Sequence, residues 1–275
     1  MRTMRRCVAI WLWLKFTAYR VSALRVRDGV KMLNKDTIYN ENCLDTMRKM
    51  DDGIVDLVVT SPPYDDLRDY EGYVFDFEPI ANELYRVIKE GGVIVWVVGD
   101  ATKNGSETGT SFRQALYFMS LGFNLHDTMI YQKNSSKYPA RADSNRYTQI
   151  FEYMFIFSKG KPEANLICDK PNKWAGHMDW SGKNSAPVRE YGPRANIWTY
   201  ITSLNSTGHP APYPEELAGD HILTWSNEGD LVYDPFMGSG TTAKMAILNK
   251  RHYIGSEISS NYCDIANKRV PWIML

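Results

Sequence analysis

Two short segments of the sequence place reactive or ligand-binding residue types at tight turns. The first is Thr60-Ser61-Pro62-Pro63-Tyr64, which directly follows an apolar run. Two consecutive prolines hold the backbone rigid and cannot continue strand hydrogen bonding, so they leave carbonyl oxygens exposed. The Ser61 hydroxyl and the Tyr64 ring are close to those carbonyls in sequence. Because Pro-Pro-Tyr is a less common turn after a buried strand, we favour ligand binding over a turn that only closes a strand.

The second segment is a glycine-containing loop, Asp234-Pro-Phe-Met-Gly-Ser-Gly-Thr-Thr242, between an apolar run and a helical pattern. Glycines let the backbone approach a ligand closely, and the N–H groups that begin a helix can face an anion. Thr241 follows Gly240 where a P-loop requires Lys, and the glycine spacing differs from the dinucleotide fingerprint. Glu257 ends the next strand, where an acid typically holds ribose hydroxyls. Loop and acid suggest a nucleoside-bearing cofactor, although the loop alone fits a simple strand-to-helix turn equally well.

Apolar runs alternate with helical patterns through most of the chain, which is typical of an α/β fold. Strands are expected at residues 37–39, 54–60, 93–98, 129–131, 151–157, 231–234 and 253–257, and helices from residue 45 and at 77–89, 111–121, 214–225 and 241–249. Both segments then follow the carboxyl end of a strand, where ligands bind in open α/β sheets. Residues 159–208 lose this periodicity, so they are expected to form an irregular insertion.

Together the two segments resemble the motifs of the amino-methyltransferases, which transfer a methyl group from S-adenosylmethionine to an exocyclic nitrogen of a DNA base. The catalytic motif precedes the cofactor motif, which is similar to the circularly permuted β group, and the resemblance covers roughly Lys35 to Arg269. It implies a doubly wound, mostly parallel seven-stranded sheet of the class I methyltransferase type. The implied organisation is a catalytic half at 32–158, a target-recognition insertion at 159–208 and a cofactor-binding half at 209–275.

The resemblance also implies which residues form the site. Ser61, Pro62, Pro63 and Tyr64 would be catalytic. The residues implied to bind the cofactor are Asn42, Asp234, Pro235, Phe236, Gly238, Ser239, Gly240, Thr241, Glu257, His209 and Pro210. Family members commonly have Gly-Asp where this chain has Glu41-Asn42, and the Asn42 amide could still hydrogen-bond an adenine edge. His209 could be a general base, but packing beside the proline-rich segment that follows is the favoured reading.

The target base is the harder question. Ser-Pro-Pro-Tyr is more typical of members that act on cytosine N4, whereas Asp-Pro-Pro-Tyr or Asn-Pro-Pro-Tyr is typical of adenine N6. Cytosine N4 is therefore the leading prediction and adenine N6 the alternative. A cytosine-C5 enzyme would need a cysteine in a Pro-Cys context, and none of the four cysteines has one. Two further readings are an inactive DNA-binding regulator and an amino-methyltransferase that acts on protein or RNA, whose motif usually begins with Asn.

Charge is distributed unevenly, although 32 Lys/Arg balance 32 Asp/Glu in the 275 residues. The region 133–194 holds eleven Lys/Arg and six Asp/Glu with interleaved aromatic residues, Tyr138, Tyr147, Trp174, Trp180 and Tyr191. Basic residues and aromatics suit phosphate contacts and base stacking, so we expect this region to contact double-stranded DNA; a solvated surface insertion is the other reading. Asp100 and Thr102 could contact cofactor or base, or could be ordinary strand-end residues.

The first residues differ from the rest of the chain. Residues 1–27 contain seven Lys/Arg and no acid around a short apolar run, so 1–31 is interpreted as an appended, poorly ordered leader, with a natural start near Met32.

The cysteines form no C-x-x-C pair, which predicts neither a zinc site nor disulfides and favours a reduced, cytoplasmic protein. No metal and no membrane span are expected. The resemblance allows a monomer or a homodimer, with a restriction endonuclease as a partner in the same system.

Overall fold

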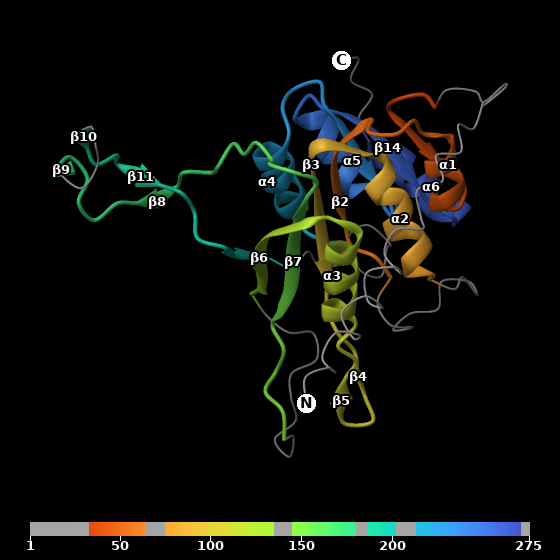
Figure 1. The fold of residues 1–275 in the computed structure, drawn as a ribbon, viewed down its shortest axis with the longest axis horizontal. Helices are drawn as coiled ribbons and strands as arrows, with labels where there is room; N and C mark the ends of the chain where they lie inside the picture. The colour runs from red at the N-terminus through yellow and green to blue at the C-terminus, as the bar shows by residue number, and fades with distance from the viewer. Residues whose placement is uncertain (1–32, 64–74, 135–144, 180–185, 202–212, 271–275) are drawn as a thin grey trace, which may run out of the picture. The chain divides into compact units, whose positions relative to one another are not determined.

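The computed structural model of the protein describes residues 33–63, 75–134, 145–179, 186–201 and 213–270 (Figure 1). The chain divides into two compact units, Met1–Lys31 and Met32–Leu275, and every described residue belongs to the second. The predicted leader therefore lies outside the described residues. No helix in the described ranges is long and apolar enough to cross a membrane.

A single large sheet forms the centre of the described unit (Figure 1). Its strands lie in the order β1 (Thr37–Tyr39), β14 (His252–Ser256), β13 (Leu231–Asp234), β2 (Val55–Thr60), β3 (Ile88–Val98), β7 (Phe151–Ser158), β6 (Asn124–Lys133) and β12 (Ile197–Tyr200). Neighbouring strands are parallel, except that β7 is antiparallel to both β3 and β6. The predicted α/β class with a mostly parallel sheet is confirmed.

Helices cover both faces of the sheet. They are α1 (Cys43–Lys49), α2 (Phe77–Val87), α3 (Thr110–Leu121), α4 (Glu215–Trp225), α5 (Thr241–Leu248) and α6 (Ser260–Arg269). Alternate residues of β3 point to opposite faces: Val95 packs in the core that includes α4, α5 and α6, and Trp96 packs in the core that includes α1, α2 and α3. Because both faces are buried, the central strands are continuous apolar runs in the sequence, and this is why they were predictable.

The sheet has eight strands rather than the predicted seven. The additional strand, β12, lies inside the stretch 159–208 that was predicted to be irregular, and it pairs with β6 at the sheet edge. It has four residues, of which only Trp198 and Tyr200 are buried, so its periodicity is too short to recognise. Before β12, the described insertion residues form an arm with two small ladders, β8 (Lys170–Pro171) with β11 (Tyr191–Gly192) and β9 (Met178–Asp179) with β10 (Ala186–Pro187), which projects at the left of Figure 1.

The two predicted site segments leave the sheet at the same edge. Thr60 at the end of β2 is in register with Trp96 of the parallel strand β3, and β13 runs parallel to β2 on its other side. We call this the carboxyl edge, where β2, β3, β13 and β14 end, and the opposite side the amino edge. Ser61 follows β2 and Pro235 follows β13, so both begin at the carboxyl edge, as the sequence predicted for a ligand site.

Candidate active site

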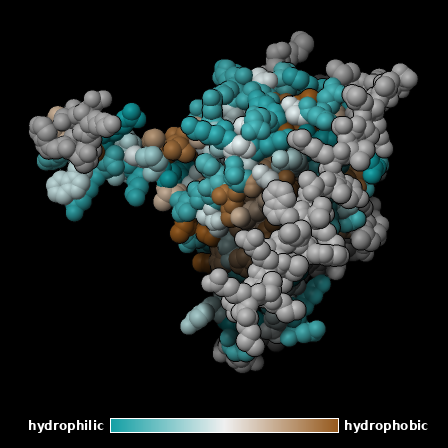
Figure 2. Space-filling view, in the orientation of Figure 1, coloured by the Kyte–Doolittle hydropathy of each residue, from teal (hydrophilic) through white to brown (hydrophobic). Residues whose placement is uncertain are grey.

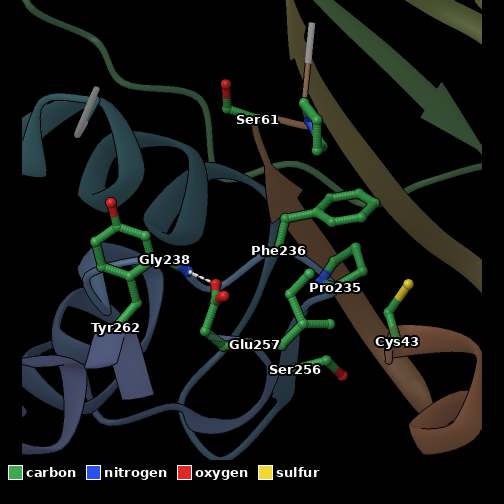
Figure 3. Close-up of a pocket in the computed structure, with 10 residues that line it drawn as sticks. Cys43, Ser61, Pro235, Phe236, Gly238, Ser256, Glu257 and Tyr262 are labelled. Atoms are coloured by element: carbon green, nitrogen blue, oxygen red, sulfur yellow. Dashed lines mark hydrogen bonds between the residues drawn. The ribbon is translucent and has the colours of Figure 1, made fainter. Parts of the chain in front are cut away.

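One pocket opens at the carboxyl edge where the two predicted segments meet (Figure 3). Its walls come from the start of α1, the end of β2, the loop between β13 and α5, and the end of β14 with the following helix α6. The lining residues are Cys43, Ser61, Pro63, Pro235, Phe236, Gly238, Ser256, Glu257, Ile258 and Tyr262. The pocket combines hydroxyl, carboxylate and aromatic groups, so it offers polar contacts at some walls and apolar contacts at others.

The predicted site residues fall into three groups. Six line the pocket: Ser61, Pro63, Pro235, Phe236, Gly238 and Glu257. Six others lie beside or beneath it and are not among the lining residues: Asn42, Pro62, Asp234, Ser239, Gly240 and Thr241. The remaining three, Tyr64, His209 and Pro210, lie outside the described residues. The structure therefore brings the segment predicted to be catalytic and the segment predicted to bind the cofactor into one pocket.

Glu257 organises the floor of the pocket. One carboxylate oxygen accepts a hydrogen bond from the backbone N–H of Gly238 at 2.8 Å (Figure 3). The other accepts one from the N–H of Ser259 at 2.9 Å. Burial raises the pKa of the Glu257 carboxyl above its usual value, against the lowering effect of those backbone donors. The carboxylate is therefore fixed in orientation, and its remaining lone pairs can accept hydrogen bonds from hydroxyl groups of a ligand.

Asp234 supports the pocket from beneath. Its carboxylate accepts hydrogen bonds from the Thr60 hydroxyl at 2.6 Å, the Thr242 hydroxyl at 2.5 Å and the Phe236 N–H at 3.0 Å. The hydroxyl of the partly buried Tyr213 in turn contacts the Thr242 hydroxyl. Burial raises the pKa of Asp234, although these donors oppose the shift. Because Thr60 immediately precedes Ser61, this network links the segment predicted to be catalytic to the glycine loop through Asp234.

The glycine loop depends on two left-handed residues. Gly238 has a φ of 52° and Gly240 a φ of 83°, a region that favours glycine. Gly240 caps α5, and a Cβ added to it would lie 2.9 Å from the Ala266 Cβ on α6. The neighbouring Ser239 accepts hydrogen bonds from Arg269 of α6 through its carbonyl and its hydroxyl, both at 2.6 Å. Gly240 and Ser239 therefore hold the loop against α6, the helix that supplies Tyr262 to the pocket.

We expect Gly240→Ala to lower the free energy of unfolding more than the same substitution at another glycine with a similar left-handed backbone. Alanine at a left-handed position costs about 1–2 kcal/mol, and overpacking against Ala266 adds about 1–3 kcal/mol. Gly229→Ala is the matched control, because Gly229 has a φ of 86° and has no atoms within 4 Å of an added Cβ. Urea denaturation of both variants measures the difference; equal losses would contradict tight packing of Gly240 on α6.

Asn42 has a structural role that the family resemblance did not imply. It is the N-cap of α1, and its side-chain oxygen accepts a hydrogen bond from the Leu44 N–H at 2.9 Å. The pocket is lined from this turn by the next residue, Cys43. Burial raises the pKa of the Cys43 thiol to about 12, so the thiol stays protonated near neutral pH and is unsuited to nucleophilic attack.

Four lining residues were not predicted from the sequence: Cys43, Ser256, Ile258 and Tyr262. Three of them are direct sequence neighbours of predicted residues: Cys43 follows Asn42, and Ser256 and Ile258 flank Glu257. Tyr262 lies on α6, a helix that the sequence patterns did not indicate.

Asp100 has the structural role that was left open: its carboxylate accepts from the Ser111 N–H at 3.0 Å and the Ser111 hydroxyl at 2.5 Å, in the first turn of α3.

Known proteins resemble this chain in sequence and in fold. A family model described as DNA methylase, N6_N4_Mtase, matches residues 55–268. The chain is 60% identical over 240 residues to the orphan methyltransferase M.BamHII of Bacillus amyloliquefaciens, covering 80% of this chain and 89% of that relative. Among solved structures, PvuII DNA methyltransferase, described as cytosine-N4-specific, has a TM-score of 0.69 at 20% identity and covers 87% of this chain and 88% of that one.

A second solved structure, a complex of M1.HpyAVI with SAM, has a TM-score of 0.58 at 25% identity and covers 85% of this chain and 98% of that one. The likeness to the PvuII enzyme shows a shared fold. The family follows from the two sequence matches, since the model spans well over half of the chain and the relative is 60% identical over most of both lengths. This chain belongs to the N6_N4_Mtase family of DNA methylases.

Proposed function

We propose that this DNA methyltransferase transfers a methyl group from S-adenosylmethionine to the exocyclic N4 of a cytosine in double-stranded DNA, with adenine N6 as the alternative acceptor. The observation that carries the proposal is a shared pocket: Ser61 of the catalytic segment lines the same cavity as Gly238 and Glu257 of the cofactor segment. A methyl donor and an acceptor nitrogen held by these groups would lie next to each other, and such positioning supplies much of the rate of a bimolecular transfer.

The lining residues fit the parts of S-adenosylmethionine, which supplies an activated methyl group on a sulfonium when it is bound. Phe236, Ile258 and Tyr262 offer apolar and aromatic surface that suits an adenine ring. The fixed carboxylate of Glu257 offers acceptors for the ribose hydroxyls. The left-handed backbone at Gly238 lets the loop approach the ligand without a side chain in the way.

On the acceptor side, Ser61 and the rigid Pro62-Pro63 backbone would hold the amino group. Its nitrogen is a poor nucleophile because the lone pair is delocalised into the ring. Hydrogen bonds from the amino group to the Ser61 hydroxyl and the Pro62 carbonyl favour a more pyramidal, nucleophilic nitrogen. The base must leave the stack to reach the pocket, and Tyr64 is proposed to stack on it, a type of contact worth about 1–3 kcal/mol. The buried link from Thr60 to Asp234 keeps this segment in register with the cofactor loop.

The serine at position 61 is the reason for proposing cytosine rather than adenine as the target, because Ser-Pro-Pro-Tyr is more typical of the cytosine-N4 enzymes. We expect incubation with unmethylated DNA and methyl-labelled S-adenosylmethionine, followed by digestion to nucleosides, to give N4-methylcytosine. Chromatography against standards identifies the product. N6-methyladenine would support the alternative acceptor, and no modified nucleoside from any DNA would contradict both.

Residues 159–208 remain the proposed target-recognition insertion. In its described part, the Lys173 ammonium lies 5.6 Å from the centre of the Trp174 ring, and the Trp174 side chain is 61% exposed. This pair offers one cation and one stacking surface to nucleic acid. A restriction endonuclease that recognises the same sequence is proposed as a partner in the same system, without direct contact being required.

A further inference from the structure

A tight hairpin follows β3 at the carboxyl edge and is not part of the predicted recognition region. Its strands are β4 (Thr102–Lys103) and β5 (Ser106–Glu107), joined by Asn104 and Gly105. These two have φ values of 51° and 77°, as in the two-residue turns that match strand twist. All residues from Thr102 to Glu107 are exposed, and the hairpin projects below the sheet with a hydrophilic surface (Figures 1 and 2).

The hairpin has hydrogen bonds at its base, and its tip is contacted by Arg146 of the connection between β6 and β7. At the base, the Thr108 N–H donates to the Ala101 carbonyl at 2.9 Å, and Asp100 holds the first turn of α3. At the tip, the Arg146 guanidinium contacts the Gly105 carbonyl and lies 4.0 Å from the Glu107 carboxylate. A partner that contacts this hairpin therefore meets a preorganised element, which lowers the entropy lost on binding.

Strand register places the hairpin on the same side of the molecule as Ser61. β3 lies directly beside β2, with Thr60 opposite Trp96, so both strands end at the carboxyl edge. The connection from β6 to β7 also begins and ends there, since the Lys133 N–H donates to the Ile150 carbonyl at 2.7 Å and Val98 is opposite Tyr153. In sequence, residues 133–146 of this connection contain four basic side chains and one acid. The hydrophilic hairpin and the two ends of this connection thus lie at the carboxyl edge, the edge at which Ser61 follows β2.

The projecting arm of residues 159–193 is attached at the opposite side. Ser158 at the end of β7 is opposite Val93, the amino-edge part of β3, and the Asn165 N–H donates to the Thr224 carbonyl near the end of α4 at 2.8 Å. At its other end, Arg194 is paired with Asp169 and with Asp220 of α4. The hairpin and the two ends of the β6–β7 connection therefore lie at the same sheet edge as Ser61, whereas the arm starts at the amino edge.

We propose that the β4–β5 hairpin contacts the DNA duplex beside the target base, with Lys103 on a phosphate and Asn104 toward the base edges. A DNA duplex with its target base at Ser61 must pass across the carboxyl edge, where this hairpin projects. A Lys ammonium binds phosphate without sequence preference, and an Asn amide can both donate to and accept from a base edge. The inference rests on the proposed DNA methylation and assigns the hairpin a part in substrate binding.

The test is the double variant Lys103→Ala/Asn104→Gly, in which glycine keeps the left-handed backbone of the turn. We expect KM for DNA to rise about tenfold and the slope of log affinity against log salt to become shallower by about one, the effect of losing one phosphate contact. The Kd for S-adenosylmethionine without DNA and kcat at saturating DNA should stay within about twofold of wild type. An unchanged melting temperature confirms that the fold is intact.

Asn34→Ala/Lys35→Ala is the matched control, because it removes the same residue types from exposed positions before β1, at the amino edge. This control should keep the wild-type KM for DNA and the wild-type salt slope. If the hairpin variant also keeps both while the wild-type protein methylates DNA, the hairpin proposal is wrong and the proposed function stands. If the wild-type protein methylates no DNA, the proposed function is wrong. Binding of a labelled duplex then tests the hairpin by itself: equal affinity of the wild type and the hairpin variant would contradict the hairpin proposal.

Discussion

Ser61→Ala is expected to lower kcat by roughly 100- to 1,000-fold, the usual cost of losing one oriented hydrogen-bonding group at a reacting centre. Ser61 lines the pocket just after β2, whereas Gly238 and Glu257, the residues proposed to hold the cofactor, come from the β13–α5 loop and the end of β14. Removing the hydroxyl should therefore leave the Kd for S-adenosylmethionine within about twofold of wild type. Single-turnover methylation and calorimetric titration of the cofactor measure the two effects separately.

Two further variants sharpen this result. Ser120→Ala removes an exposed hydroxyl on α3 that bonds only the Tyr117 carbonyl among the described contacts, and it should leave kcat unchanged. Ser61→Asn restores an acceptor and should retain more turnover than Ser61→Ala, because an amide oxygen can also accept from the amino group of the base. A Ser61→Ala enzyme with wild-type kcat, or with a large loss of cofactor affinity, would contradict the catalytic role of Ser61.

The sheet and the location of the site were predictable from the sequence for a physical reason. Strands β2 and β3 are buried on both faces, so they appear as continuous apolar runs. The end of β2 is marked by two prolines, and the end of β3 is marked by Gly99 and Asp100. Helix α6 lacked such a pattern, because among its ten residues only Cys263 and Ala266 are buried. Tyr262 was not predicted because it lies on this unpredicted helix, from which it lines the pocket.

The roles of individual motif residues were less predictable than their location. A motif does not distinguish a residue that contacts a ligand from one that positions the loop, because both are required for the same site. Asp234 is 1% exposed and hydrogen-bonded to Thr60 and Thr242, so it supports the loop from within the core. Asn42 is a second such residue. It is the N-cap of α1, a position that favours Asn, but this role was not predicted because the helix was expected to begin only at residue 45.

Glu257→Gln should weaken S-adenosylmethionine binding about 10- to 100-fold, which corresponds to the roughly 1.5–3 kcal/mol of a hydrogen bond to a charged group. Both carboxylate oxygens of Glu257 accept from backbone N–H groups, at 2.8 Å from Gly238 and 2.9 Å from Ser259. Glutamine of the same size must turn its NH₂ group toward one of these donors, which breaks that bond and withdraws an acceptor from the ribose. Titration calorimetry without DNA measures the loss.

The pH dependence of cofactor binding provides an independent test of Glu257. Burial raises the pKa of this carboxyl above its usual value, so its proton is taken up at a higher pH than the roughly 4.3 of an exposed Glu. A protonated carboxyl accepts hydrogen bonds poorly, and cofactor affinity should therefore fall on acidification before ordinary surface carboxylates titrate. Glu257→Gln should lack this part of the pH dependence. If wild type and variant lose affinity in parallel between pH 8 and pH 5, another group controls the titration and Glu257 does not hold the ribose as an ionised acceptor.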